Sequence, residues 1–251
     1  VNLVFLRGYD KTTLNVNVQG DYDTALGEDA AESSMPMSAH SRVFVREASI
    51  SQEFYFNGSA LDSYNFKGGI FTEKWGYTDY YNPVNVINPQ DFSYHLMREW
   101  RDRAIGVYAL KNTLYFSQYF FIDGFVNPVF EGNNESSAAF ASYNTAAIDA
   151  ATAADASYDG TRYPDASLRT AAYGARIGVK SRDFEAHLMY YDGYDHASTL
   201  NYAMDGADLS ISRSYSRLRM IGLDYMANFA NDINFKGEAA YFLQGKRFSL
   251  D

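Results

Sequence analysis

Residues 173–190 read YGARIGVKSRDFEAHLMY, two alternating runs joined by the polar triplet Ser181-Arg182-Asp183. One face of the two runs carries apolar side chains: Tyr173, Ala175, Ile177, Val179, Phe184, Ala186, Leu188 and Tyr190. The opposite face carries Arg176, Gly178, Lys180, Glu185 and His187. Alternation with a period of two around a short polar turn is typical of an antiparallel hairpin. The stretch therefore predicts two paired strands with one apolar face and one charged face.

The same alternation recurs along the chain, in residues 12–22, 62–74, 221–229 and 233–244. Each segment is close to the roughly 9–11 residues with which a tilted strand crosses a bilayer. The polar faces of the predicted strands carry both signs of charge, at Glu47, Glu53, Lys67, Arg176, Lys180, Glu185, His187, Asp224, Lys236 and Glu238. Counting such segments predicts about ten strands in all.

The predicted connections alternate between short and long. Tight turns are expected at residues 9–11, 57–59, 111–112, 181–183 and 231–232, where turn-forming residue types gather. Long connections are expected at 23–41, 75–101, 124–169 and 195–212. Outer-membrane barrels have short turns on the periplasmic side and longer loops outside the cell.

These patterns predict an all-β fold, an antiparallel up-and-down transmembrane β-barrel with short helices in its long loops. We expect residues 1–251 to form one such domain, either a whole barrel or the visible part of a larger one. A soluble sandwich or barrel with one dry face is the alternative, since it uses the same alternation. Tyr and Phe near strand ends, charges on the opposite face and alternating loop lengths favour the membrane barrel.

The composition narrows the classes of function. No apolar run approaches the roughly 18 residues of a membrane-spanning helix. The absence of cysteine excludes disulfides and thiol chemistry. A net charge of -10, with 21 scattered Lys and Arg, argues against a nucleic-acid partner. The start at Val1, without a leader, suits a mature exported protein or an excised segment.

The most distinctive segment, residues 75–92, reads WGYTDYYNPVNVINPQDF. A strand ending in Trp-Gly, two Asn-Pro steps six residues apart and a following Asp-Phe resemble the signature of a family of large bacterial outer-membrane barrels of poorly defined, transport-related function. The resemblance covers residues 43–123, about a third of the chain. It implies a barrel in the cell outer membrane, with the lipid bilayer and lipopolysaccharide as partners. The ending Phe248-Ser249-Leu250-Asp251 departs from the family in lacking a terminal aromatic residue. A larger barrel, of which these residues are one part, is therefore an alternative.

Each Asn-Pro step biases the asparagine away from the α region, so residues 79–91 are expected to form a folded loop. A short helix is predicted from Pro89, because Phe92, Leu96 and Trp100 recur at helical spacing. We expect this loop and helix to narrow the barrel mouth, or else to pack on its rim as a structural loop. The Ala-rich residues 146–156 favour a second helix, either another constriction or part of an exposed cap.

A lumen of mixed charge suits a porin-like channel for small hydrophilic solutes. The candidate solute-binding residues are Lys67, Arg98, Arg101, Arg176, Lys180, Glu185, His187, Lys236 and Glu238. In the alternative, these charges pair and fill a closed lumen, and the protein is a structural or adhesive surface barrel. Assembly of the barrel into a homo-oligomer is a further alternative.

We expect no enzyme, no catalytic residue, no cofactor and no metal site. Asp195-His196 and the Glu185/His187 pair are weak evidence for acid–base chemistry, because such neighbours are common. The chain has no nucleophile elbow, no metal-binding His pair at helical spacing and no phosphate-binding Gly loop. The acidic residues of 21–32 match no EF-hand. A barrel hydrolase that uses a loop histidine is the third and least favoured alternative.

Overall fold

The computed structural model of the chain describes residues 2–9, 11–22, 41–57, 60–78, 82–92, 103–134, 148–149, 152, 157–205, 208–229 and 233–243. These residues form thirteen strands. In chain order they are β1 (Asn2–Tyr9), β2 (Thr12–Tyr22), β3 (Ser41–Tyr55), β4 (Ser63–Phe71), β5 (Val107–Ser117), β6 (Phe120–Asn127), β7 (Ser157–Arg162), β8 (Ala172–Lys180), β9 (Phe184–Tyr194), β10 (Thr199–Asp205), β11 (Asp208–Ser214), β12 (Arg217–Phe229) and β13 (Ile233–Phe242).

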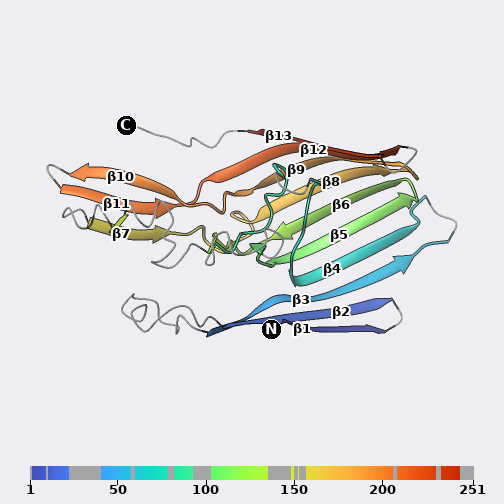
Figure 1. The fold of residues 1–251 in the computed structure, drawn as a ribbon, viewed down its shortest axis with the longest axis horizontal. Helices are drawn as coiled ribbons and strands as arrows, with labels where there is room; N and C mark the ends of the chain where they lie inside the picture. Colours follow the sequence, from blue (N-terminus) through green and yellow to red (C-terminus); the bar gives the residue numbers. More distant parts are fainter. Residues whose placement is uncertain are drawn as a thin grey trace.

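Ten of the strands form one antiparallel sheet, in the order β1-β2-β3-β4-β5-β6-β8-β9-β12-β13. Apart from β7, β10 and β11, each strand pairs with the next one in the chain, so the sheet runs up and down as predicted. Figure 1 shows β4, β5, β6 and β8 nearly face-on and β1, β2 and β13 nearly edge-on, so the sheet is bent into a trough. The all-β class and the large antiparallel sheet are confirmed.

The expectation of a closed barrel is not met within the described residues. The edge strands β1 and β13 do not pair with each other there, and they lie at opposite edges of the trough (Figure 1). Closure requires the two edges to share hydrogen bonds at a consistent tilt and stagger. The described residues thus form an open, curved sheet.

Short and long connections alternate, as the sequence predicts. Short turns follow β1, β3, β5, β8 and β12, while long segments follow β2, β4, β6 and β9. Because the strands are antiparallel, the short turns gather at one end of the sheet and the long segments at the other (Figure 1).

One predicted turn is wrong. Lys111-Asn112 lies inside β5, and the turn falls instead after Ser117. Both side chains have tertiary partners, since Lys111 Nζ lies 2.5 Å from Glu73 Oε1 in the segment after β4, and Tyr64 of β4 donates a 2.5 Å hydrogen bond to Asn112 Oδ1. These tertiary contacts stabilise turn-forming residue types within a strand.

Two predicted long loops contain strands. Residues 195–212 contain β10 and most of β11, which pair antiparallel, and β7 from the 124–169 connection joins β11 in parallel. This three-stranded sheet lies beyond the long-loop end of the main sheet (Figure 1). The helix predicted from Pro89 falls mainly on 93–102, which lies outside the described residues, as does most of 146–156.

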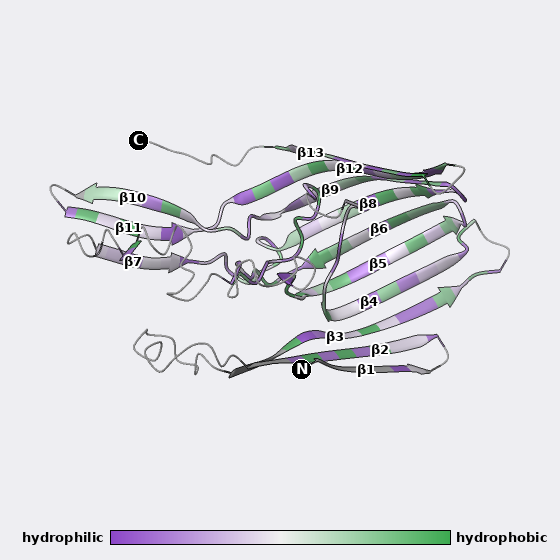
Figure 2. Cartoon of the chain, in the orientation of Figure 1, coloured by the Kyte–Doolittle hydropathy of each residue, from purple (hydrophilic) through white to green (hydrophobic). Residues whose placement is uncertain are grey.

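The main sheet has two chemically different faces. Ile177, Leu188 and Leu223 stand directly opposite one another on β8, β9 and β12 and point outward, with Leu188 53% exposed. The exposed outer residues are Leu14, Ile50, Phe54, Tyr108, Leu110, Tyr173, Ile177, Val179, Phe184, Leu188, Tyr190, Ile221, Leu223, Tyr225, Phe229, Ile233, Phe235 and Tyr241. Figure 2 shows the resulting alternation of hydrophobic and hydrophilic residues along the strands.

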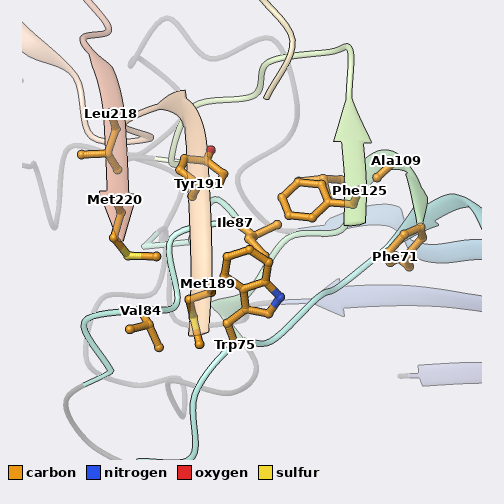
Figure 3. Packing of buried hydrophobic residues seen from close by; sticks show 11 residues of the cluster. Phe71, Trp75, Val84, Ile87, Ala109, Phe125, Met189, Tyr191, Leu218 and Met220 are labelled. Carbon is orange, nitrogen blue, oxygen red and sulfur yellow. The ribbon is translucent and has the colours of Figure 1, made fainter. Parts of the chain in front are cut away.

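The apolar core lies on the inner face, under the segment that follows β4. Trp75, Val84 and Ile87 of this segment are buried. Figure 3 shows them beside the inward side chains of the sheet, Phe125, Met189, Tyr191, Leu218 and Met220. A Cβ atom at Gly222 would lie 2.9 Å from Val84, so the glycine permits the close approach of this segment.

No helix of the described residues combines the length and apolarity needed to cross a bilayer.

Candidate functional site

Residues 72–78, here called the strap, cross the inner face of the trough. The strap meets β3, β5, β6, β9 and β13 in turn. Thr72 Oγ1 donates a hydrogen bond to Glu47 Oε1 of β3 (2.7 Å), and Glu73 forms an ion pair with Lys111 of β5 (2.5 Å). Trp75 packs edge-on against Phe125 of β6, with the ring centroids 5.7 Å apart, and Tyr77 stacks on His187 of β9 (5.5 Å). Thr78 N donates a hydrogen bond to Glu238 Oε1 of β13 (2.5 Å). One short segment thereby connects strands from opposite halves of the sheet.

The two Asn-Pro steps hold the segment that contains the strap. Asn82 Nδ2 donates to Trp75 O at 2.8 Å. Asn88 Nδ2 donates to Ile105 O at 2.7 Å, and Asn88 Oδ1 accepts from Glu73 N at 2.9 Å. The following prolines bias the backbone of both asparagines away from the α region. The asparagine side chains then make hydrogen bonds to the main chain in place of regular backbone pairing. Residues 82–91 thus form the predicted folded loop, apart from two isolated bridges at Gln90 and Asp91, and 79–81 lie outside the described residues.

A cleft of about 510 Å³ opens beside the strap, toward the short-turn end of the sheet. Strap residues form one side, and β5, β6, β8, β9 and β12 form the rest. The lining residues are Lys74, Gly76, Tyr77, Lys111, Thr113, Tyr115, Ser117, Gln118, Phe120, Phe121, Asp123, Arg176, Lys180, Glu185, His187 and Asp224.

Asp123 is the centre of the first charged group in the cleft, and it is 2% exposed. Arg176 donates to Asp123 Oδ2 from Nη2 at 2.6 Å and from Nε at 3.0 Å. Lys111 Nζ lies 3.7 Å from the same oxygen and 2.5 Å from Glu73. Asp123 was not among the predicted site residues, although it shares the inner face with Phe121 and Phe125. Reading the alternation of 120–127 would have placed it there.

His187 and Asp224 form a second polar group in the cleft. They are register partners on β9 and β12, and His187 Nδ1 lies 2.6 Å from Asp224 Oδ1. His187 Nε2 lies 3.3 Å from Glu185 Oε1, and the ring is covered by Tyr77 and Phe121. No group of three or more His, Asp or Glu side chains in the described part of the chain is arranged to hold a metal ion.

The structure brings together four of the predicted solute-binding residues, because Arg176, Lys180, Glu185 and His187 all line the cleft. Lys67 lies elsewhere on the inner face, with Nζ 4.3 Å from the centroid of the Phe71 ring. Glu238 binds the strap, and Lys236 lies on the same side of β13 but is exposed. Arg98 and Arg101 lie outside the described residues.

His196 connects three segments at the long-loop end. Its Nδ1 lies 2.6 Å from Glu131 O and its Nε2 lies 3.0 Å from Ile87 O, while Phe130 stacks on the ring. Asp195, which precedes it, accepts a hydrogen bond from Ala197 N instead. Both ring nitrogens therefore face main-chain carbonyl oxygens rather than an acidic partner. This geometry fits a structural role better than acid–base chemistry.

The contacts of His196 predict a pH-dependent stability. Burial lowers the pKa of the imidazole below its ordinary value of 6.5, although the carbonyls of Glu131 and Ile87 and the charge of Asp195 act in the opposite direction. The folded chain then binds fewer protons at this site than the unfolded chain, so stability present above pH 6.5 is lost as the pH falls. Denaturant titrations at about pH 7.5 and about pH 5 should show a smaller loss of unfolding free energy in His196→Gln than in the wild type. Equal losses in the two proteins would contradict this assignment.

Comparison of the chain with protein-family models, with curated proteins and with solved structures finds no match.

Proposed function

We propose that the sheet is the wall of a β-barrel in the cell outer membrane, and that the barrel is a channel for small hydrophilic solutes. The distribution of side chains carries the proposal: large apolar residues are exposed on the outer face, while charged residues and the strap occupy the inner face. A transmembrane barrel has this arrangement, with lipid outside and a polar interior.

The extent of the exposed apolar face supports lipid as its surroundings. Exposed residues such as Leu14, Tyr108, Leu188 and Ile233 lie on strands from β2 to β13. Soluble monomers rarely expose a continuous apolar patch of more than a few hundred Å². A soluble sandwich would cover this face with a second sheet, but the small sheet of β7, β10 and β11 lies beyond the end of the main one (Figure 1).

We assign to the strap the role of narrowing the lumen of the channel. It packs on the inner face from β3 to β13 and leaves the cleft open at one side. Solutes would then pass between the strap and the charged residues of β6, β8 and β9. The lumen remains narrow for as long as Trp75 stays in the core.

A closed structural barrel is the second candidate, and the ion pairs favour it. Lys111, Arg176 and Lys180 each lie within 4.0 Å of a carboxylate, as expected of charges that fill an interior. Its loops, including the small sheet, would then bind partners outside the cell. Conductance separates the two candidates.

The membrane assignment is tested by folding the chain into lipid vesicles and running it unheated and heated on a gel. We expect a heat-dependent change in mobility, as barrels resist unfolding by detergent. A chain that is monomeric without detergent and shows no such change would overturn the assignment.

The channel assignment is tested in planar bilayers. We expect stepwise currents from the wild type and larger ones after deletion of residues 79–100, because the deletion removes Asn82 and Asn88, whose side chains hold the strap. If neither protein gives a current, the closed barrel replaces the channel.

A further inference from the structure

The fixed charges of the cleft balance one another. Four cations line it, Lys74, Lys111, Arg176 and Lys180. Three carboxylates line it as well, Asp123, Glu185 and Asp224, and Glu73 on Lys111 is the fourth. An ion of either sign would have to compete with existing ion pairs, and breaking a buried pair is costly. The balance favours a neutral solute.

Two carboxylate oxygens and His187 Nε2 are the buried atoms of the cleft that have no hydrogen bond within the described part of the chain. Asp123 Oδ1 and Asp224 Oδ2 are buried and have no hydrogen-bond partner among the described residues, although both side chains line the cleft. Asp224 is 0% exposed. A buried acceptor without a donor lowers stability, because it has lost water without gaining a new hydrogen bond. Hydroxyl groups of a solute are donors that would remove this cost without adding charge.

Aromatic side chains supply the remaining recognition surface. Tyr77, Tyr115, Phe120 and Phe121 line the cleft, and the Tyr115 and Phe121 rings lie 5.8 Å apart. Aromatic rings pack well against the C–H faces of a ring that carries hydroxyls at its edge. Thr113, Ser117 and Gln118 add neutral polar groups on the same surface.

Given the proposed channel function, on which this step rests, we infer that the cleft binds a neutral, polyhydroxylated solute, a sugar of one or two rings. Hydroxyls of the sugar donate to Asp123 and Asp224, and its apolar faces pack on Tyr115 and Phe121. The volume of about 510 Å³ lies in the range of small-molecule sites. Arg176 holds Asp123 in place, and His187 holds Asp224.

The test uses the full chain folded in detergent and three probes that share one sugar ring: glucose, the anion glucuronate and the cation glucosamine. Isothermal titration should show glucose binding at least about tenfold more tightly than either charged probe, equivalent to about 1.4 kcal/mol. Preferred binding of glucuronate or glucosamine, or equal binding of all three, would overturn the inference.

Two variants of β5 locate the binding. Tyr115→Ala removes an aromatic wall of the cleft and should weaken glucose binding at least about tenfold. Tyr108→Ala removes the same side chain from the outer face of the same strand and should leave binding unchanged. Equal effects would place the sugar elsewhere. Heat-dependent gel mobility confirms that each variant is folded.

Ion current measured on the same preparation separates this inference from the proposed function. Current without glucose binding overturns the inference and leaves the channel standing. Glucose binding without current overturns the channel and leaves the cleft as a sugar site of a closed barrel.

Discussion

Replacement of Ile221 by arginine is expected to lower the unfolding free energy in lipid vesicles by about 2–4 kcal/mol. Ile221 lies within β12, is 43% exposed, and stands between Tyr190 of β9 and Tyr241 of β13 on the outer face. In the proposed barrel a guanidinium there would face hydrocarbon near the middle of the bilayer. Ile177→Arg on β8 should have a similar cost. Reversible denaturant titration, with the heat-dependent gel shift as the folded signal, measures the change.

The matched control is Asn234→Arg on β13. Asn234 is exposed, donates a hydrogen bond to Asn228 Oδ1 at 2.7 Å, and lies on the inner side of its strand, where water would solvate the added charge. We expect a change within about 1 kcal/mol. Similar losses for Ile221→Arg and Asn234→Arg would contradict the assigned faces, and no loss for either would argue against lipid on the outer face.

Strands and their faces were predictable because the period of two is local. The runs around Ser181-Arg182-Asp183 placed Arg176 and His187 on one face, and the structure has both in the cleft. The position of each strand in the sheet followed as well, because neighbours in the chain are neighbours in an up-and-down sheet. Because these strands are antiparallel, the alternating turn lengths also placed the short turns at one end of the sheet and the long connections at the other.

The tertiary partners were not predictable from local pattern. Lys111 reads as part of a turn, but its ion pair with Glu73 of the strap holds it within β5. The loop of 195–212 reads as irregular because β10 and β11 are short and polar, and their pairing with each other and with β7 stabilises them. The Asn-Pro spacing marked a folded loop, yet the acceptors of Asn82 and Asn88 depend on the folded chain.

The clearest test of the strap is Trp75→Ala. Trp75 is 0% exposed and packs edge-on against Phe125, with Ile87 and Met189 in the same cluster. Truncation of a buried tryptophan leaves a cavity and typically costs about 3–5 kcal/mol. Asn82 can still donate to the main-chain carbonyl of residue 75 in the variant, so the strap loses its packing on Phe125 but keeps this hydrogen bond. We expect this loss of unfolding free energy together with larger single-channel currents.

A control variant, and the measurement of stability and current on each variant, make the test specific. Tyr202→Ala removes an exposed aromatic residue from β10, away from the strap, and should change stability by no more than about 0.5 kcal/mol and leave the current unaltered. If Trp75→Ala loses stability but conducts like the wild type, the strap supports the fold without restricting the passage. If the current rises while the sheet stays folded, the strap is the restriction, because its docking on the inner face is what the variant weakens.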